Sequence, residues 1–229
     1  KVVMPHNTPK IKVNNVERNG GEVVWCEPDQ KYRESVLKDV VDETGATVVH
    51  PYNDERIMAG QGTCAKELLE DVPDLDSIVS PVSGGGLLSG SLLAAKNMKS
   101  SITVYGAEPE EADDAYQSLK LGRIVPNKTI NTICDGLRAQ IGSKTFPVIQ
   151  NLVDDIIPIA EEDIINSLRM IWERLKIIVE YSKKKDFFSL YKILETKIDQ
   201  FNLDLYEDIF IPFIAYTAVN FTSTLLQKN

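Results

Sequence analysis

The sequence of 229 residues contains few cysteines and few histidines, and neither kind is clustered. Its three cysteines, Cys26, Cys64 and Cys134, are widely spaced and odd in number, so they predict neither a disulfide framework nor a zinc site. The two histidines, His6 and His50, add no group of metal ligands. This usage favours a protein of the reducing cytosol.

Long apolar runs are also missing from the chain. The longest, at 209–219, is interrupted by Pro212 and is shorter than the roughly 20 residues that span a bilayer, so no membrane segment is expected. The chain starts at Lys1 and continues with Val2 and Val3, without the basic and then apolar order of a signal peptide. We therefore expect this start to be a cut rather than a natural N-terminus.

Positive charge is in the minority, because 25 Lys and Arg residues stand against 34 Asp and Glu residues, giving a formal net charge of -9. Such a chain is repelled by a phosphate backbone and by an anionic lipid surface, so neither nucleic acid nor a membrane is expected as a partner. The remaining composition, 43% hydrophobic and 26% charged, is typical of a packed globular domain.

Apolar periodicity predicts strands that alternate with helices. Strands are expected at 22–26, 47–50, 77–82 and 102–107, and helices at 31–43, 56–70 and 87–98. A later helix, which begins with acidic residues, is expected to cover the sheet with an apolar stripe. That stripe comprises Ile164, Leu168, Ile171, Trp172, Leu175 and Ile178. The alternation predicts an α/β fold with a parallel sheet flanked by helices.

A glycine-rich segment, Ser83-Gly84-Gly85-Gly86, stands between an expected strand and a helix of apolar and small residues. Consecutive glycines let backbone N–H groups converge without obstruction by Cβ atoms, and the following helix adds its unpaired N–H groups and positive dipole end. The segment therefore predicts a phosphate-binding loop, with a flexible turn as the alternative. It is neither a dinucleotide fingerprint nor a Walker loop, because it contains neither the G-x-G-x-x-G motif nor a terminal G-K-[ST].

Acidic residues gather after another expected strand, which leads into Glu108. The acids that follow it are Glu110, Glu111, Asp113 and Asp114. Carboxylates from a strand end and the next loop, together with a free backbone carbonyl, can form the oxygen shell that Mg²⁺ or Ca²⁺ requires. A solvated loop with helix-capping acids would have the same sequence, so the residues alone leave both interpretations open.

Several stretches carry a family resemblance through their order and spacing. They are WCEPDQKYRE, VVHPYND with AGQGTCAKELLE, SPVSGGGLLSG, VYGAEPEEADDAYQSLKLGRIVP, TICDGLRAQIGSKTFPVI, and LVDDIIPIAEEDI with IWERLKIIVE. Over residues 1–180 the chain resembles the fold-type II pyridoxal-phosphate enzymes, most closely the eukaryotic serine racemase and serine/threonine dehydratase branch. This implies a tryptophan synthase β-like fold, incomplete here, with a partial small domain at 1–52 and a partial cofactor-binding domain at 53–180.

The resemblance also implies ligands. In that family the glycine-rich loop holds the phosphate of pyridoxal 5'-phosphate, which implies this role for Ser83, Gly84, Gly85 and Gly86. Ser83 stands where a fourth glycine often occurs, and it is expected to weaken the loop slightly. The family implies serine or threonine as the small-molecule partner and a homodimer as the assembly.

The family's divalent-metal site matches three residues of the acidic segment. It uses a glutamate, a backbone carbonyl and an aspartate, which correspond to Glu108, Ala112 and Asp114. The resemblance therefore implies Mg²⁺ or Ca²⁺ at these residues.

Family motifs are missing from the sequence as well. The S-F-K-x-R-G-like motif of the Schiff-base lysine and the S-x-G-N-H-G loop for the substrate carboxylate do not occur, and both would precede Lys1. The lysines that are present, such as Lys66, Lys96 and Lys176, are expected on solvated helix surfaces. No catalytic residue is therefore assigned, and the 229 residues by themselves are expected to be inactive.

From Tyr181 onward the resemblance stops, because the family's P-x-x-G segment and S-G-G-N loop are not matched. Residues 181–229 are interpreted as a divergent, mostly helical tail, with chance periodicity as the alternative. Its apolar residues at helical spacing are Phe187, Leu190, Leu194, Ile198 and Phe201.

Three functions remain open for the chain. The first is a segment of a racemase or dehydratase of amino-acid metabolism that acts on serine or threonine. The second is a non-catalytic product that binds a partner subunit. The third is a domain that binds another phosphorylated metabolite without covalent chemistry.

Overall fold

A computed structural model describes residues 1–175, which divide into two compact units at Val49 and His50. The expected tail at 181–229 and the last stripe residue, Ile178, lie outside the described residues. Within the described residues, no helix has the length and apolar character needed to cross a membrane.

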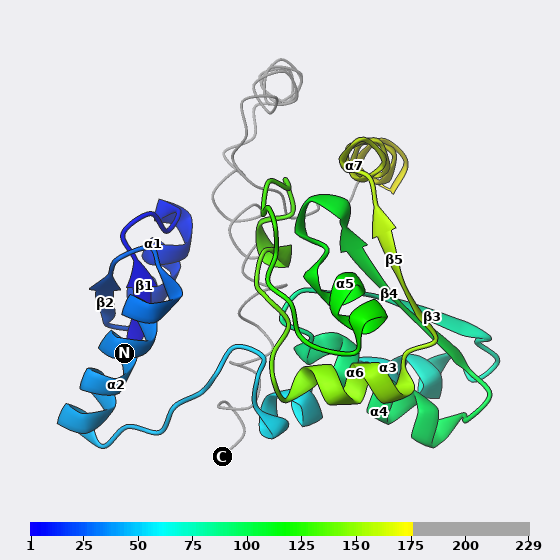
Figure 1. Ribbon diagram of the computed structural model, residues 1–229, viewed down its shortest axis with the longest axis horizontal. Coiled ribbons are helices and arrows are strands. Elements are labelled where there is room, and N and C mark those ends of the chain that lie inside the picture. Colours follow the sequence, from blue (N-terminus) through cyan, green and yellow to red (C-terminus); the bar gives the residue numbers. More distant parts are fainter. Residues whose placement is uncertain (176–229) are drawn as a thin grey trace. The chain divides into compact units, whose positions relative to one another are not determined.

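The first unit contains β1 (Val2–Pro5), α1 (Lys10–Arg18), β2 (Val23–Cys26) and α2 (Gln30–Thr44) (Figure 1). β1 and β2 pair in parallel, with Val2 opposite Val23. Asp29 begins α2 by accepting a hydrogen bond from the Lys31 N–H at 2.8 Å, and Gly45 ends it with φ +67°, a left-handed conformation that suits glycine. The strand at 22–26 and the helix at 31–43 are thus found close to their expected bounds.

The strand expected at 47–50 is absent, because residues 45–50 have no regular structure. Its β-branched residues favour an extended chain, but a strand also needs a neighbour for its backbone N–H and C=O groups. Val49 is 63% exposed, so this apolar run does not enter a core within the described residues.

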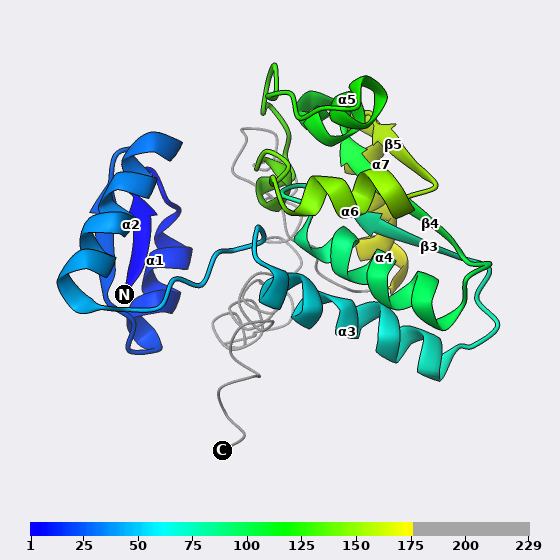
Figure 2. The same ribbon diagram turned by 60° about the horizontal axis from the view of Figure 1, so that its bottom comes forward.

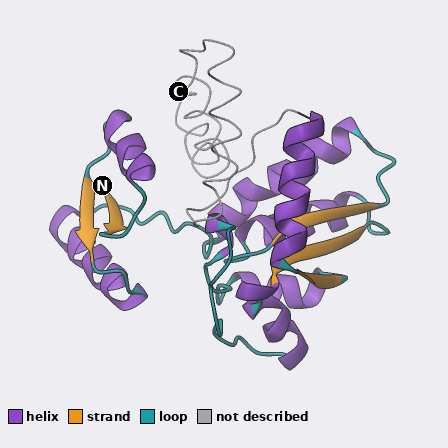
Figure 3. Ribbon diagram, turned by 90° about the horizontal axis from the view of Figure 1, so that it is seen from above, coloured by secondary structure: helices purple, strands orange, loops and turns teal. Residues whose placement is uncertain are grey.

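The second unit begins with a helix and continues with alternating strands and helices (Figures 1 and 2). Its main elements are α3 (Glu55–Asp71), β3 (Ser77–Pro81), α4 (Gly86–Met98), β4 (Thr103–Pro109), α5 (Asp114–Leu121), α6 (Thr145–Leu152), β5 (Asp155–Ile159) and α7 (Glu161–Leu175). Short 3-10 turns lie at Glu110–Ala112 and Asp135–Leu137. The three strands form a parallel sheet in the order β3-β4-β5, which confirms the predicted fold class (Figure 3).

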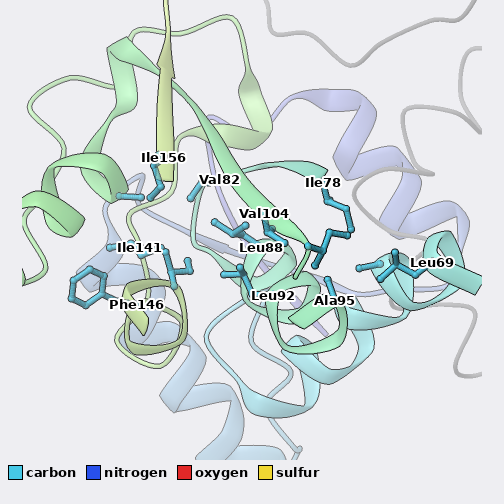
Figure 4. Close-up of a cluster of buried hydrophobic side chains, with 14 residues drawn as sticks. Leu69, Ile78, Val82, Leu88, Leu92, Ala95, Val104, Ile141, Phe146 and Ile156 are labelled. Carbon is cyan, nitrogen blue, oxygen red and sulfur yellow. The ribbon is translucent and has the colours of Figure 1, made fainter. Parts of the chain in front are cut away.

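Helices α3, α4 and α6 lie on one side of this sheet, and the core fills the space between them (Figures 2 and 4). Ile78 of β3 points into the core, whereas the next residue, Val79, is 61% exposed, as expected from the alternation of side chains along a strand. Full burial of a side chain such as Leu88 stabilises the fold by roughly 1.5 to 3 kcal/mol.

A glycine permits the close packing of α3 against α4. A Cβ atom on Gly90 would lie only 2.3 Å from the carbonyl oxygen of Met58. This contact brings the backbones of the two helices together and so fixes the direction in which α4 leaves the glycine-rich segment.

Helix α7 follows β5 and has Glu161, Glu162 and Asp163 in its first turn, as expected. The side chains of its apolar stripe at 164–172 are half-buried.

Candidate cofactor and cation sites

The glycine-rich segment connects β3 to the N-terminus of α4. Gly85 precedes the helix with φ +87°, a conformation that residues with a side chain rarely adopt. A Cβ atom at this position would also lie 2.6 Å from Ile141 Cδ1 and 2.8 Å from Thr145 Oγ1. Gly85 is therefore required for both its backbone conformation and its packing.

The backbone N–H groups of this segment are available to a ligand. Within residues 1–175, the N–H groups of Gly84, Gly85 and Gly86 donate no hydrogen bond. Their carbonyl groups are occupied: Gly84 accepts from Thr145 Oγ1 at 2.7 Å, and Gly85 accepts from the Ser89 N–H at 2.9 Å. Free donors at the start of the 13-residue helix α4 form the arrangement that binds anions.

Ser83 directs its hydroxyl group toward another segment of the chain. Its Oγ accepts a hydrogen bond from the Ala139 N–H at 3.0 Å and donates one to the Ala139 carbonyl at 3.3 Å. The hydroxyl therefore anchors the beginning of the glycine-rich segment to residue 139.

Tyr52 lies against the same segment, a contact that the sequence did not reveal. A Cβ atom on Gly84 would fall 2.3 Å from Tyr52 Cγ, so only a glycine fits beneath this ring. The next residue, Asn53, accepts a hydrogen bond from the Lys144 N–H at 2.7 Å. Both residues belong to the VVHPYND stretch, whose match to the family was the only signal for them.

The two acids assigned to the cation site, Glu108 and Asp114, are each only 1% exposed. Glu108 accepts hydrogen bonds from the N–H groups of Tyr116 at 3.0 Å and Ala115 at 3.3 Å, in the first turn of α5. Glu108 therefore does cap a helix, but from a buried position, so the alternative of a solvated acidic loop does not hold for these two carboxyl groups.

Asp114 has one satisfied and one unsatisfied carboxylate oxygen. Its Oδ2 accepts from the Ile141 N–H at 2.7 Å, whereas Oδ1 is buried and finds no hydrogen-bond partner among residues 1–175. A buried oxygen without a partner is costly, and a cation would remove that cost. Ala112, whose carbonyl was assigned as the third ligand, is also buried.

Burial perturbs both carboxyl groups in the same direction. It raises the pKa of Glu108 to about 8, against the hydrogen bond from Tyr116, and the negative charge of Asp114 adds to the rise. Burial likewise raises the pKa of Asp114 to about 6, opposed first by the hydrogen bond from Ile141. A divalent cation would favour the ionised form of both groups.

The donor set is small for a metal. Throughout the described part of the chain, no three side chains of His, Cys, Asp or Glu are grouped so that they could hold a metal ion. A cation here would therefore depend on two carboxylates, a backbone carbonyl and water, which is a set suited to Mg²⁺ or Ca²⁺ rather than to zinc.

Comparison with known proteins places these features in a family. The family model described as "Pyridoxal-phosphate dependent enzyme" matches residues 1–194. The chain belongs to this family. It is 50% identical to a serine racemase of Arabidopsis thaliana over 181 residues, which cover 79% of this chain and 55% of that protein.

Solved structures agree with this placement. Maize serine racemase matches with a TM-score of 0.76 and 47% identity over 78% of this chain and 54% of its own. A threonine deaminase of T.th. matches with a TM-score of 0.74 and 38% identity over 78% of this chain and 59% of its own. The expected resemblance is confirmed, and the chain spans about half the length of these relatives.

In this member of the family, residues 139–145 touch both candidate sites. The Ile141 N–H donates to Asp114, while the Gly142 N–H donates to the Gly84 carbonyl at 3.2 Å. Ala139 holds Ser83, as described above. The segment thus supports the glycine-rich loop and the buried carboxylates at the same time, and sequence analysis did not assign it a role.

Proposed function

We propose that this chain carries the phosphate-binding and cation-binding parts of an enzyme that resembles serine racemase and L-serine (threonine) dehydratase. The observation that supports it most is the set of free N–H groups at Gly84, Gly85 and Gly86, in front of α4. The likeness to serine racemases and to a threonine deaminase supports the assignment of serine or threonine as substrate.

The glycine-rich loop would hold the phosphate group of pyridoxal 5'-phosphate. Ser83, Gly84, Gly85 and Gly86 would contribute backbone groups, and the positive end of the α4 dipole would add to the attraction. Tyr52 lies against Gly84. When bound, this cofactor supplies the electron sink that makes the α-proton of an amino acid acidic.

The buried carboxylates would hold a divalent cation together with the carbonyl of Ala112. Glu108 and Asp114 would each contribute oxygen ligands, including the Asp114 Oδ1 that now lacks a partner. Mg²⁺ and Ca²⁺ both accept such hard oxygen ligands. The cation would keep the two buried carboxylates ionised and so stabilise the fold around residue 141.

We assign no catalytic residue in these 229 residues. Lys66 pairs with Glu70 at 2.6 Å, and Lys96 donates to the Ile102 carbonyl at 2.6 Å and pairs with Asp154 at 2.7 Å. Lys176 lies outside the described residues. Lysine nitrogens held in such ion pairs and hydrogen bonds are poor nucleophiles, so we propose that the chain alone is inactive.

A second candidate function is non-covalent binding of another phosphorylated metabolite. It depends on the same N–H groups, because they recognise the phosphate and not the molecule attached to it. Titrating the chain with pyridoxal phosphate and, separately, with inorganic phosphate would separate the two. Much tighter binding of pyridoxal phosphate would support the proposed function, equal affinity for the two ligands would support the second candidate, and no binding would contradict both.

A further inference from the structure

We infer that Thr145 is a positioning residue for the glycine-rich loop: its hydroxyl holds the Gly84 carbonyl so that the Gly85 N–H faces the phosphate. The inference rests on the proposed function, because it concerns how the loop is prepared for an anion. Thr145 begins α6 and is fully buried, although it carries a polar side chain.

The Thr145 hydroxyl acts both as a hydrogen-bond donor and as an acceptor. Its Oγ1 lies 2.7 Å from the Gly84 carbonyl oxygen, and it accepts a hydrogen bond from the Gly142 N–H at 3.0 Å. A hydroxyl has one proton, and the Gly84 carbonyl is closer to Oγ1 than the Gly142 carbonyl, which lies at 3.2 Å. We therefore place the proton on the bond to Gly84.

That bond determines the direction of the next N–H group. Across a trans peptide, the carbonyl of one residue and the N–H of the next point in opposite directions. Because the Gly84 carbonyl points to Thr145, the Gly85 N–H points away from Thr145. Like the N–H groups of Gly84 and Gly86, it donates no hydrogen bond within residues 1–175.

Without Thr145, this peptide would have little to hold it. Glycines on both sides make rotation of the peptide easy, since neither residue has a Cβ atom to restrict it. A rotated peptide would turn the Gly84 carbonyl toward the anion and replace an attractive donor by a repelling acceptor. The Gly142 N–H also donates to the Gly84 carbonyl, but at the longer distance of 3.2 Å.

Thr145 is itself held firmly. Its carbonyl accepts a hydrogen bond from Ser89 Oγ at 3.2 Å, and Ser89 is a buried residue of α4. The branched Cβ of threonine restricts χ1, and the hydrogen bonds of Oγ1 with Gly84 and Gly142 select the direction of the hydroxyl. The loop, α4 and α6 are thereby joined through Thr145, whose neighbour Phe146 lies with Ile141 at one end of the core (Figure 4).

The test uses the full chain and the substitution Thr145→Val, which keeps the shape but removes the donor. Inorganic phosphate and pyridoxal phosphate would be titrated separately. We expect the valine variant to bind both at least about tenfold more weakly, which corresponds to about 1.4 kcal/mol. Thr145→Ser restores the donor and should bind within about threefold of the original chain.

Thr132→Val provides a matched control. Thr132 is also fully buried, and its Oγ1 also accepts a backbone N–H, from Cys134 at 3.1 Å. It makes no hydrogen bond to the glycine-rich loop. This variant should therefore keep its affinity for phosphate, which separates a loop-specific effect from the general loss of a buried hydroxyl.

A second readout needs no ligand. In the free chain, the NMR resonance of the Gly85 N–H should shift in Thr145→Val and return in Thr145→Ser, and it should not move in Thr132→Val. If the valine variant does not fold, Thr145→Cys can replace it, because cysteine has a similar size and a weaker hydrogen-bond donor. This variant should show a smaller loss of ligand affinity and a smaller shift of the Gly85 resonance.

The outcomes distinguish the two proposals. If the original chain binds neither ligand, the proposed function fails, and the Gly85 resonance alone decides whether Thr145 positions the loop. If the original chain binds and Thr145→Val binds equally well with an unmoved Gly85 resonance, the inference about Thr145 is wrong while the proposed function stands.

Discussion

The raised pKa of Glu108 predicts that the cation-free chain loses stability as the pH rises. In the unfolded chain, the Glu108 carboxyl releases its proton above its usual pKa of 4.5. In the folded chain its pKa is about 8, so it keeps the proton to a higher pH. The contribution of Glu108 to the stability of the folded state is therefore fully present below pH 4.5, and it is lost as the pH rises toward 8. Asp114 acts in the same direction, but only up to its pKa of about 6.

The size of the effect follows from the burial of Glu108, which is 1% exposed and so is little screened by water. Each pH unit in this window costs about 1.4 kcal/mol per carboxyl group, so the part of the loss that Glu108 causes between about pH 5 and about pH 7 is roughly 2 to 3 kcal/mol. Asp54 does not disturb this window, because its hydrogen bonds with Arg56 lower its pKa and move its titration to more acidic values.

The assay is urea unfolding of the full chain across this pH range, in the presence of a chelator. Glu108→Gln removes one titrating group and should flatten the slope above about pH 6, where Asp114 no longer contributes. Glu110→Gln, at an exposed acid of the same segment, should leave the slope unchanged. Added Mg²⁺ should oppose the loss by favouring the ionised carboxylates, so its stabilising effect should grow with pH. An unchanged slope in Glu108→Gln would refute the assignment of the raised pKa to this residue.

Three further predictions concern ligands and activity. The double change Glu108→Gln with Asp114→Asn should abolish the rise in melting temperature that Mg²⁺ or Ca²⁺ produces. If the rise is retained, the cation binds at another site. Gly85→Asp places a side chain and a negative charge in the loop, so phosphate and pyridoxal phosphate should no longer protect this loop from proteolysis; equal protection of the variant would contradict the phosphate site. The purified 229 residues should form no pyruvate from serine, no 2-oxobutanoate from threonine and no D-serine, even with pyridoxal phosphate and Mg²⁺; product formation that a single lysine substitution abolishes would overturn this.

The local parts of the fold could be predicted from sequence because they depend on neighbouring residues. The helix at 87–98 and the strand at 77–82 follow from periodicity, and the structure has them at Gly86–Met98 and Ser77–Pro81. The strand expected at 47–50 failed because its propensity is local, whereas a strand depends on a partner from elsewhere in the chain.

The supporting residues of the candidate site were not predictable in the same way. Thr145 meets Gly84 from 61 positions away, and Asn53 meets Lys144 from 91 positions away. Neither residue type is unusual at its place in the sequence, and nothing local indicates its distant partner. Glu108 and Asp114 were found because acids are conspicuous, but their burial, which sets their chemistry, depends on the packing of α5 and residue 141.

Ser83 shows that the conformation of the glycine-rich loop depends on hydrogen bonds to other segments as well as on its glycines. As a substitute for glycine it was expected to weaken a phosphate site, yet its hydroxyl forms a reciprocal pair with Ala139. Thr145 holds the loop one residue later, at the Gly84 carbonyl. The loop is thus fixed from behind by side chains, while the N–H groups that follow stay free to donate. An anion site needs both properties, because donors that are already oriented need not be reorganised when the ligand arrives.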